Sequence, residues 1–330
     1  MKKRFDEKDL KLFEQLVSSN QLVLKKSMTK YLKKKYTKVI ETPEYVLAEG
    51  DIPIALIAHL DTVFDKTPVE MFYDREKNVL WSPQGLGADD RAGIFAIIKI
   101  IQSGLRPHII FTTDEEIGGV GARKLATIDC PFKDLRYIIQ LDRRGFNDCV
   151  FYDCANEQFT KYVEEFGFKE ANGSFSDISF ICPAWKVAGV NLSVGYKDEH
   201  SFVERLYVSP LKATIEKVKI MLQEEEIPFF KFVYDEYMQR FYNLYGIPGL
   251  DVVTCSKCNK EFLEEEIFPV KDLDGKTIFL CPDCLVSSNV NWCSICGEGF
   301  KTNDSFAVWC DDCRDRIFNE EMEEVYSVDV

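Results

Sequence analysis

Five short motifs in the first 200 residues supply side chains that bind divalent metal ions. They are Ala58-His59-Leu60-Asp61-Thr62, Gly87-Ala88-Asp89-Asp90, Asp114-Glu115-Glu116, Leu141-Asp142 and Glu199-His200. The chain has three histidines, and two of them fall within these motifs. Imidazole and carboxylate groups are ligands for zinc and similar ions. Two adjacent ions need about five protein ligands, one of them shared. The motifs offer that number in His59, Asp89, Glu116, Asp142 and His200.

Two further acids in these motifs have predicted roles beside the metal. Glu115 is next to a predicted ligand on an expected turn, so its carboxylate can point elsewhere. There it can act as a base that accepts a proton from water and passes it to a leaving amine. Asp61 lies two residues after His59 on an extended segment and therefore projects to the same side. It can accept the second imidazole N–H and fix the orientation of the ring.

Apolar runs precede three of the motifs. Residues 54–60, 108–112 and 136–141 are predicted to be strands that are buried on both faces. The acids follow their carboxyl ends, where open α/β sheets place their sites. Further strands are expected at 148–153 and 187–194, and helices at 6–36 (one or two), 91–102, 121–126, 156–166 and 209–223. This alternation predicts an α/β fold with a mixed, mostly parallel sheet sandwiched by helices.

The motifs resemble those of the co-catalytic dizinc exopeptidases, which include peptidase T, carboxypeptidase G and the aminoacylases. The resemblance covers residues 5–223, and the motifs occur in the order of that family. It implies that Asp89 bridges two zinc ions. His59 and Asp142 would complete one site, and Glu116 and His200 the other. Glu115 would be the general base, Asp61 would orient His59, and the Asp89–Asp90 peptide bond would be cis.

One departure from the family concerns an inserted domain. Peptidase T-like enzymes insert a dimerising domain between the position of Asp142 and a Gly-Thr-Asp turn that begins a helix near the site. Gly173-Ser174-Phe175-Ser176-Asp177 resembles that turn, and Asp142 and Asp177 are too close for such a domain. The inserted domain also supplies a histidine, whereas His108 lies inside an apolar strand and is predicted to be structural.

Other groups must therefore contact the substrate. Asp177 is a candidate because of the turn it ends. Tyr196, the second metal ion or a partner chain could stabilise negative charge on the carbonyl oxygen. Arg143 and Arg144 follow Asp142 directly and could bind a substrate carboxylate, although a solvated turn is the alternative interpretation.

The last 80 residues contain eight of the twelve cysteines as four Cys-x-x-Cys pairs. Each pair can hold half of a tetrahedral zinc site, which predicts two structural ions. The pairs are Cys255/Cys258, Cys281/Cys284, Cys293/Cys296 and Cys310/Cys313. A hairpin pattern around Asp274-Gly275 favours sequential pairing, as in a zinc ribbon, over the crossed pairing of RING domains. The other cysteines (130, 149, 154 and 182) are expected to be small buried hydrophobes.

The whole chain is expected to have three parts. These are a catalytic domain over 1–227, a helical aromatic linker over 228–250 and a double zinc-binding domain over 251–330. The net charge of −14 argues against nucleic-acid binding. No signal peptide or membrane span is recognisable, so a cytoplasmic protein with no membrane contact is expected.

Three functions remain open at this point. The first is a dizinc hydrolase of short peptides, an exopeptidase similar to aminopeptidases, although another divalent metal could occupy the catalytic site. The second is an amidohydrolase that removes the acyl group from an N-acyl amino acid. The third is a RING-like adaptor that binds a protein partner through the zinc tail, with an inactive hydrolase domain as scaffold.

Overall fold

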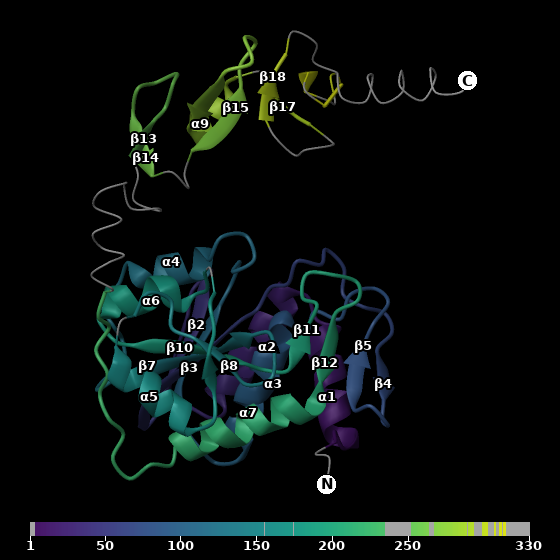
Figure 1. Cartoon of the computed structure of the whole chain (residues 1–330), viewed down its shortest axis with the longest axis vertical. Coiled ribbons are helices and arrows are strands. Elements are labelled where there is room, and N and C mark those ends of the chain that lie inside the picture. Colours follow the sequence, from purple (N-terminus) through teal and green to yellow (C-terminus); the bar gives the residue numbers. More distant parts are fainter. Residues whose placement is uncertain are drawn as a thin grey trace, which may run out of the picture. The chain divides into compact units, whose positions relative to one another are not determined.

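The computed structural model describes two compact units, Met1–Asp235 and Glu236–Val330 (Figure 1). In the first unit it describes residues 4–154, 156–173 and 175–234. In the second it describes 252–263, 267–288, 290–293, 299–302, 307, 310–311 and 313–314. Across all these residues, no helix is both long enough and apolar enough to cross a membrane.

An eight-stranded mixed sheet forms the centre of the first unit. The four middle strands β6, β3, β7 and β10 are parallel, and β2 and β8 flank them in antiparallel pairing. In spatial order the strands are β1 (Lys38–Glu41), β2 (Tyr45–Glu49), β6 (Pro107–Thr112), β3 (Ile52–His59), β7 (Tyr137–Arg143), β10 (Gly189–Ser193), β8 (Asp148–Val150) and β9 (Lys169–Glu170). The strands predicted from the apolar runs are therefore confirmed and occupy the middle of the sheet.

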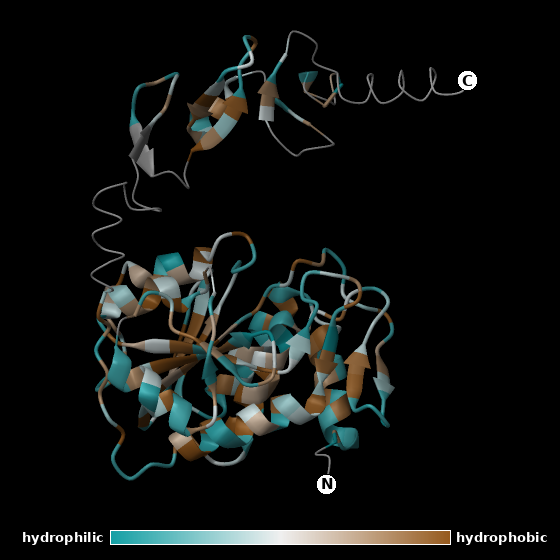
Figure 2. Cartoon of the chain, in the orientation of Figure 1, coloured by the Kyte–Doolittle hydropathy of each residue, from teal (hydrophilic) through white to brown (hydrophobic). Residues whose placement is uncertain are grey.

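Helices cover both faces of this sheet. One face packs against α1 (Glu7–Val17), α2 (Gln21–Lys33), α3 (Ala88–Gln102), α5 (Glu157–Glu165) and α7 (Val208–Met221), and the other against α4 (Val120–Ala126) and α6 (Ile178–Trp185). Alternate residues of β3 enter the two cores, with Leu56 on the first side and Ile57 on the second. Because both faces are covered, the central strands are continuously hydrophobic (Figure 2). The predicted α/β sandwich is confirmed.

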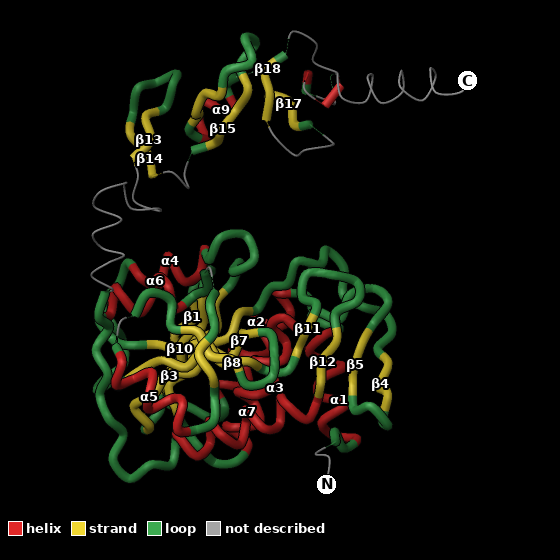
Figure 3. Tube along the Cα trace, in the orientation of Figure 1, coloured by secondary structure: helices red, strands yellow, loops and turns green. Residues whose placement is uncertain are grey.

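A second sheet in this unit was not foreseen from the sequence. It is antiparallel and contains β11 (Tyr196–Lys197), β12 (Arg205–Tyr207), β5 (Val79–Trp81) and β4 (Phe72–Asp74) in that order (Figure 3). Its strands have two or three residues each, which is too short for a periodic pattern to be recognised. The loop between β11 and β12 carries His200.

The segment after α7 also differs from the expectation. Residues 228–234 form no helix, and residues 235–250 lie outside the described part of the chain. Phe230 is buried, donates its N–H to the Arg136 carbonyl (3.1 Å) and accepts the N–H of Ala188 (2.9 Å). Phe230 packs into one core and Phe232 into the other, whereas Phe229 and Tyr234 are exposed. Burial of the two packed rings between two strand ends outweighs the helical pattern of the sequence.

The described part of the second unit contains an antiparallel pair of strands and a small mixed sheet, in which β15 and β18 are parallel and the other pairs antiparallel. Strand β13 (Val252–Thr254) pairs with β14 (Glu261–Leu263), and a four-stranded sheet has the order β16-β15-β18-β17. Its members are β15 (Phe268–Lys271), β16 (Thr277–Leu280), β17 (Val290–Trp292) and β18 (Gly299–Lys301), and α9 spans Pro282–Val286. The predicted hairpin is confirmed, with Gly275 at φ 75° in its turn. Cysteines form much of both small cores, as expected where metal replaces apolar bulk.

Arg91, in the first turn of α3, ties the helical layer to the site-bearing strand. It is 3% exposed, and its guanidinium donates to four backbone carbonyls, those of Leu16, Ser19, Leu60 and Asp61, at 2.9–3.2 Å. These carbonyls belong to the end of α1, to the connection from α1 to α2 and to the segment that follows β3. One buried cation therefore satisfies polar backbone at two chain segments that are far apart in sequence.

We expect Arg91→Met to destabilise the first unit by about 3 kcal/mol or more, because three buried carbonyls and one partly buried carbonyl lose this donor. Denaturant unfolding of the full chain, followed by aromatic fluorescence, measures this loss. Arg75→Met is the matched control, since Arg75 forms an exposed pair with Glu7 and should change stability by less than about 0.5 kcal/mol. Equal stability of the two variants would contradict the role given to Arg91.

Candidate metal centre

The five predicted ligands lie together at the carboxyl ends of the central strands. His59 Nε2 is 3.0 Å from Asp89 Oδ1 and 3.4 Å from Asp142 Oδ1. His200 Nε2 is 3.3 Å from Asp89 Oδ2 and 2.9 Å from Glu116 Oε2. The two oxygens of Asp89 thus face different imidazoles, each of which has a second carboxylate beside it. This arrangement offers two neighbouring ligand sets that share one carboxylate.

The chemistry of these donors fits a pair of divalent cations. Three carboxylates and two imidazoles crowd together, and Glu116 Oε1 is buried without a hydrogen-bond partner. Burial and the charge of Asp89 raise the pKa of Glu116 to about 7. Hydrogen bonding to Asp89 raises the pKa of His200 to about 9. Without metal, the raised pKa values of Glu116 and His200 mean that protons offset part of the repulsion between the carboxylates. Bound cations would offset the same repulsion.

Asp90 lies beside the ligands but serves the backbone. Its Oδ2 accepts the N–H of His59 (3.2 Å), and its Oδ1 accepts the N–H of Gly93 (2.9 Å). The Asp89–Asp90 peptide bond is cis, which confirms the implication of the resemblance. Gly93 must be glycine, because a Cβ there would lie 2.0 Å from the Leu141 carbonyl oxygen.

Asp61 contacts both His59 and the acidic turn. Its Oδ1 is 3.2 Å from His59 Nδ1, as expected of a group that orients the ring. The same carboxylate accepts the backbone N–H groups of Glu115 (3.0 Å) and Glu116 (2.9 Å). Asp61 therefore fixes the position of a predicted ligand and of the predicted base together, a link that the sequence did not indicate.

Glu115 is directed into the pocket that contains the ligands. Burial, followed by the negative charges of Asp142 and Asp177, raises its pKa to about 9. Its backbone is held by the Asp61 carboxylate and by the preceding residue, Asp114, which exchanges two hydrogen bonds with the Gln21 side chain (2.7 and 3.0 Å). A carboxylate so placed can exchange a proton with a molecule bound in the pocket.

Asp142 is held by a set of neutral donors. Its Oδ2 accepts from Gln140 (2.9 Å) and Ser176 (3.0 Å), and its backbone N–H bonds to Asn191 (3.0 Å). The buried hydroxyl of Tyr196 lies 3.0 Å from the Asp142 carbonyl oxygen and 3.2 Å from its Oδ1. Tyr196 lines the pocket as predicted, but its hydroxyl already contacts a predicted ligand.

The pocket around these groups has a volume of about 690 Å³. Arg143 and Arg144 both line it. Arg144 pairs with Glu199 (2.5 Å), next to His200, whose φ of 59° lies in the left-handed region that non-glycine residues rarely adopt. This ion pair connects the strand of Asp142 to the loop of His200.

Arg143 has a different environment. It donates to the Asn172 carbonyl (3.0 Å), while its Nε is buried without a partner. Asp177 does not line the pocket. It is fully buried, and it accepts a hydrogen bond from the Thr112 hydroxyl (2.5 Å). Burial raises its pKa to about 7. Its position is behind the site, at the start of α6.

Glu204 is a residue that the sequence reasoning missed. Its carboxylate is fully buried and accepts the N–H groups of Ala88 (3.0 Å) and Asp89 (3.1 Å). Burial and the Asp89 charge raise its pKa to about 8. Glu204 thereby connects the segment after His200 to the backbone of Asp89. The sequence signal for Glu204 was its position four residues after His200. That position could be interpreted only once the small sheet was known.

The cysteine pairs of the second unit also come together. The Sγ atoms of Cys255, Cys258, Cys281 and Cys284 lie within 4.8 Å of one another, as do those of Cys293, Cys310 and Cys313. Cys296 lies outside the described residues. This grouping is the sequential one. Burial opposes ionisation of Cys255, but N–H groups of Cys281, Cys258 and Lys257 lower its pKa to about 6. Thiolate character of this kind suits a metal ligand.

The four other cysteines lie in the first unit. Cys149 and Cys182 are buried, whereas Cys130 and Cys154 are half-buried. None of the four belongs to a cysteine cluster in the described part of the chain.

No protein-family model matches the chain, and no curated protein matches it. Solved structures do match its fold. A TET aminopeptidase from a marine-sediment thaumarchaeon has a TM-score of 0.54 at 13% identity, over 67% of this chain and 98% of that one. An aminopeptidase from Desulfurococcus kamchatkensis has a TM-score of 0.52 at 14% identity, over 71% of this chain and 97% of that one. A tripeptidase from Staphylococcus aureus has a TM-score of 0.50 at 15% identity, over 66% of this chain and 98% of that one. The chain therefore contains nearly the whole fold of these peptidases.

We expect about four zinc ions per chain by elemental analysis, two from each unit. Replacing Cys255, Cys281, Cys293 and Cys310 together by Ser should remove two of them. His59→Ala with His200→Ala should remove the other two. Cobalt substitution separates the classes, because only thiolate sites give intense charge-transfer absorption. If the cysteine variant retained no metal at all, the candidate dimetal centre would have to be abandoned.

Proposed function

We propose that this protein is a dizinc hydrolase of amide bonds that acts on short peptides as an exopeptidase similar to aminopeptidases. The observation that carries the proposal is the position of Asp89 between the two imidazoles, with Glu115 beside them. Asp89 would bridge the ions, His59 and Asp142 would bind one, and Glu116 and His200 the other. The distances among these five side chains support that division.

The protein groups would share the chemistry as follows. Divalent ions held by these five residues would lower the pKa of a water molecule and stabilise negative charge on a carbonyl oxygen. Glu115, which lines the same pocket, accepts the proton of the attacking water and delivers it to the leaving nitrogen. Asp61 holds His59 and the turn of Glu115, and Tyr196 and Ser176 hold Asp142.

Two observations support a peptide as the substrate. Solved proteins with this fold are named as aminopeptidases and as a tripeptidase. The pocket volume of about 690 Å³ suits a ligand of a few residues. The arrangement of the five predicted ligands beside a half-buried Glu115 argues against a scaffold that has lost its activity.

The deacylase alternative rests on Arg143. Its guanidinium is at the pocket wall, and one of its N–H groups has no acceptor in the described part of the chain. A substrate carboxylate could approach this side chain, as an N-acyl amino acid requires. Arg144 is less suited to this role because Glu199 already neutralises it.

We expect Glu115→Gln to lower kcat by at least about 100-fold, because Gln cannot carry the proton. The zinc content should stay at the wild-type value, since Glu115 is not assigned as a ligand. Glu70→Gln, which changes an exposed acid, is the matched control and should leave both quantities unchanged. Wild-type turnover in Glu115→Gln would refute the assignment of the base.

A panel of dipeptides with free or blocked ends separates the two hydrolase functions. An aminopeptidase requires a free amino end and tolerates a blocked carboxyl end, whereas the deacylase requires the reverse. In the second case Arg143→Met should raise KM with little change in kcat, because uniform binding is lost. Cleavage of neither class, by zinc-loaded protein, would count against the proposed function.

A further inference from the structure

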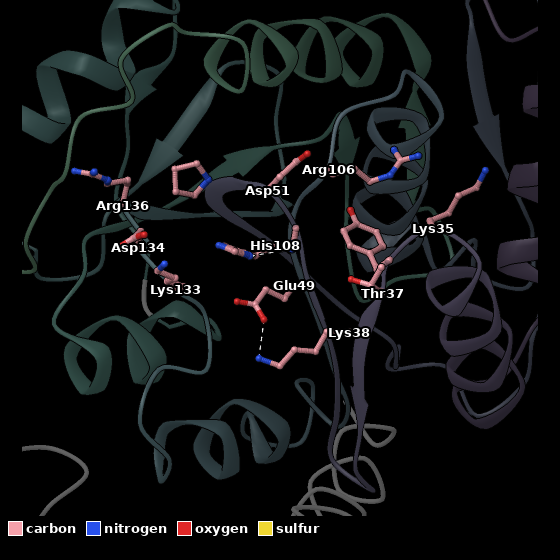
Figure 4. Close-up of a pocket in the computed structure, with 13 residues that line it drawn as sticks. Lys35, Thr37, Lys38, Glu49, Asp51, Arg106, His108, Lys133, Asp134 and Arg136 are labelled. Carbon is pink, nitrogen blue, oxygen red and sulfur yellow. Dashed lines mark hydrogen bonds and ion pairs between the residues drawn. The ribbon is translucent and has the colours of Figure 1, made fainter.

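A second pocket lies at the opposite end of the strands that carry the metal centre. It has a volume of about 710 Å³, and residues at or before the starts of β3, β6 and β7 line it (Figure 4). Five residue steps of β7 separate Tyr137 from Asp142, which is about 17 Å of extended chain. A small molecule in this pocket could therefore not contact the metal centre.

The charge of this pocket contrasts with that of the whole chain. Five lysines and arginines and three acids line it, although the chain has a net charge of −14. Lys38 and Glu49 neutralise each other at 2.6 Å. The other cations are Lys35, Arg106, Lys133 and Arg136, and the other acids are Asp51 and Asp134. The balance favours an anionic ligand.

His108 contributes a buried donor to this pocket. It is 2% exposed and stacks on Phe132, with ring centres 4.4 Å apart. Its Nδ1 accepts the N–H of Gly50 (3.1 Å), so the neutral ring carries its proton on Nε2. Burial lowers the pKa of His108 to about 4, which keeps the ring neutral at pH 7. The Lys133 carbonyl lies nearby, but Nε2 has no acceptor at hydrogen-bond geometry.

Tyr36 contributes a second buried hydrogen-bond donor to this pocket. It is 7% exposed, it lines the same pocket, and its hydroxyl has no hydrogen-bond partner among the described residues. Buried polar groups are rarely left without a partner in native proteins, and two of them at one basic pocket need a common explanation. An oxygen-rich ligand would supply acceptors to both.

We propose that this pocket binds a small oxyanion, the phosphate or carboxylate group of a metabolite. Its oxygens accept hydrogen bonds from the Tyr36 hydroxyl and His108 Nε2, and the surrounding lysines and arginines offset its charge. The ligand is distinct from the substrate of the proposed hydrolase, and its binding does not depend on that function.

Histidine ring NMR of the zinc-loaded full chain tests this site, because the chain has only three histidines. Titration with inorganic phosphate, and separately with succinate, should shift the His108 resonances in a saturable way. The titration with the lower Kd shows whether the pocket prefers a phosphate or a carboxylate group. Binding at the metal centre would shift the His59 and His200 resonances instead, and would overturn the proposal if His108 did not respond.

Tyr36→Phe should raise the Kd reported by His108 by about fivefold or more, since one hydrogen bond is lost. Its thermal stability without ligand should not fall, because the hydroxyl has no partner in the protein. Tyr31→Phe is the matched control. The Tyr31 hydroxyl is also buried without a partner, but Tyr31 does not line the pocket, so the Kd should be unchanged. Equal Kd values in both variants would mean that water satisfies these groups, and would overturn the proposal.

Discussion

The carboxylate of Asp89 is the constraint on which the rest of the site depends. Its two oxygens lie 3.0 and 3.3 Å from two imidazoles that come from different sheets. His59 ends a strand of the main sheet, whereas His200 lies in a loop of the small sheet. A carboxylate can serve both only if its own backbone is fixed, and buried Glu204 fixes it by accepting the N–H of Asp89. Glu204 directly precedes β12, so this hydrogen bond connects the small sheet to the backbone of Asp89.

The buried polar residues around the site hold backbone more often than they hold side chains. Asp61 accepts two N–H groups of the acidic turn, Asp90 accepts those of His59 and Gly93, and Arg91 donates to four carbonyls. Each connects a strand end to a neighbouring segment. Such bonds position the predicted metal ligands without occupying their candidate ligand atoms, which remain directed at one another. A cluster of acids that would repel each other is in this way held in place by the fold.

The sequence indicated the central strands and the ligand motifs because their signals are local. An apolar run such as residues 54–60 and an adjacent His-x-Asp can be recognised without knowing the rest of the fold. Glu204 could not be assigned, because its partners are more than 100 residues away. Asp177 was expected to face the substrate, yet burial behind Thr112 depends on the packing of α6. The non-helical course of residues 228–234 likewise depends on two distant strand ends.

The same strands bring polar groups to both ends of the sheet, for one physical reason. The middle of a strand that is covered on both faces is mostly apolar, so charged side chains gather at its two termini. On β6 these termini hold His108 at one end and the turn of Glu115 and Glu116 at the other. The carboxyl end concentrates acids, whereas lysines and arginines outnumber acids in the pocket at the amino end. Ligands of opposite charge are therefore directed to opposite ends of one rigid element.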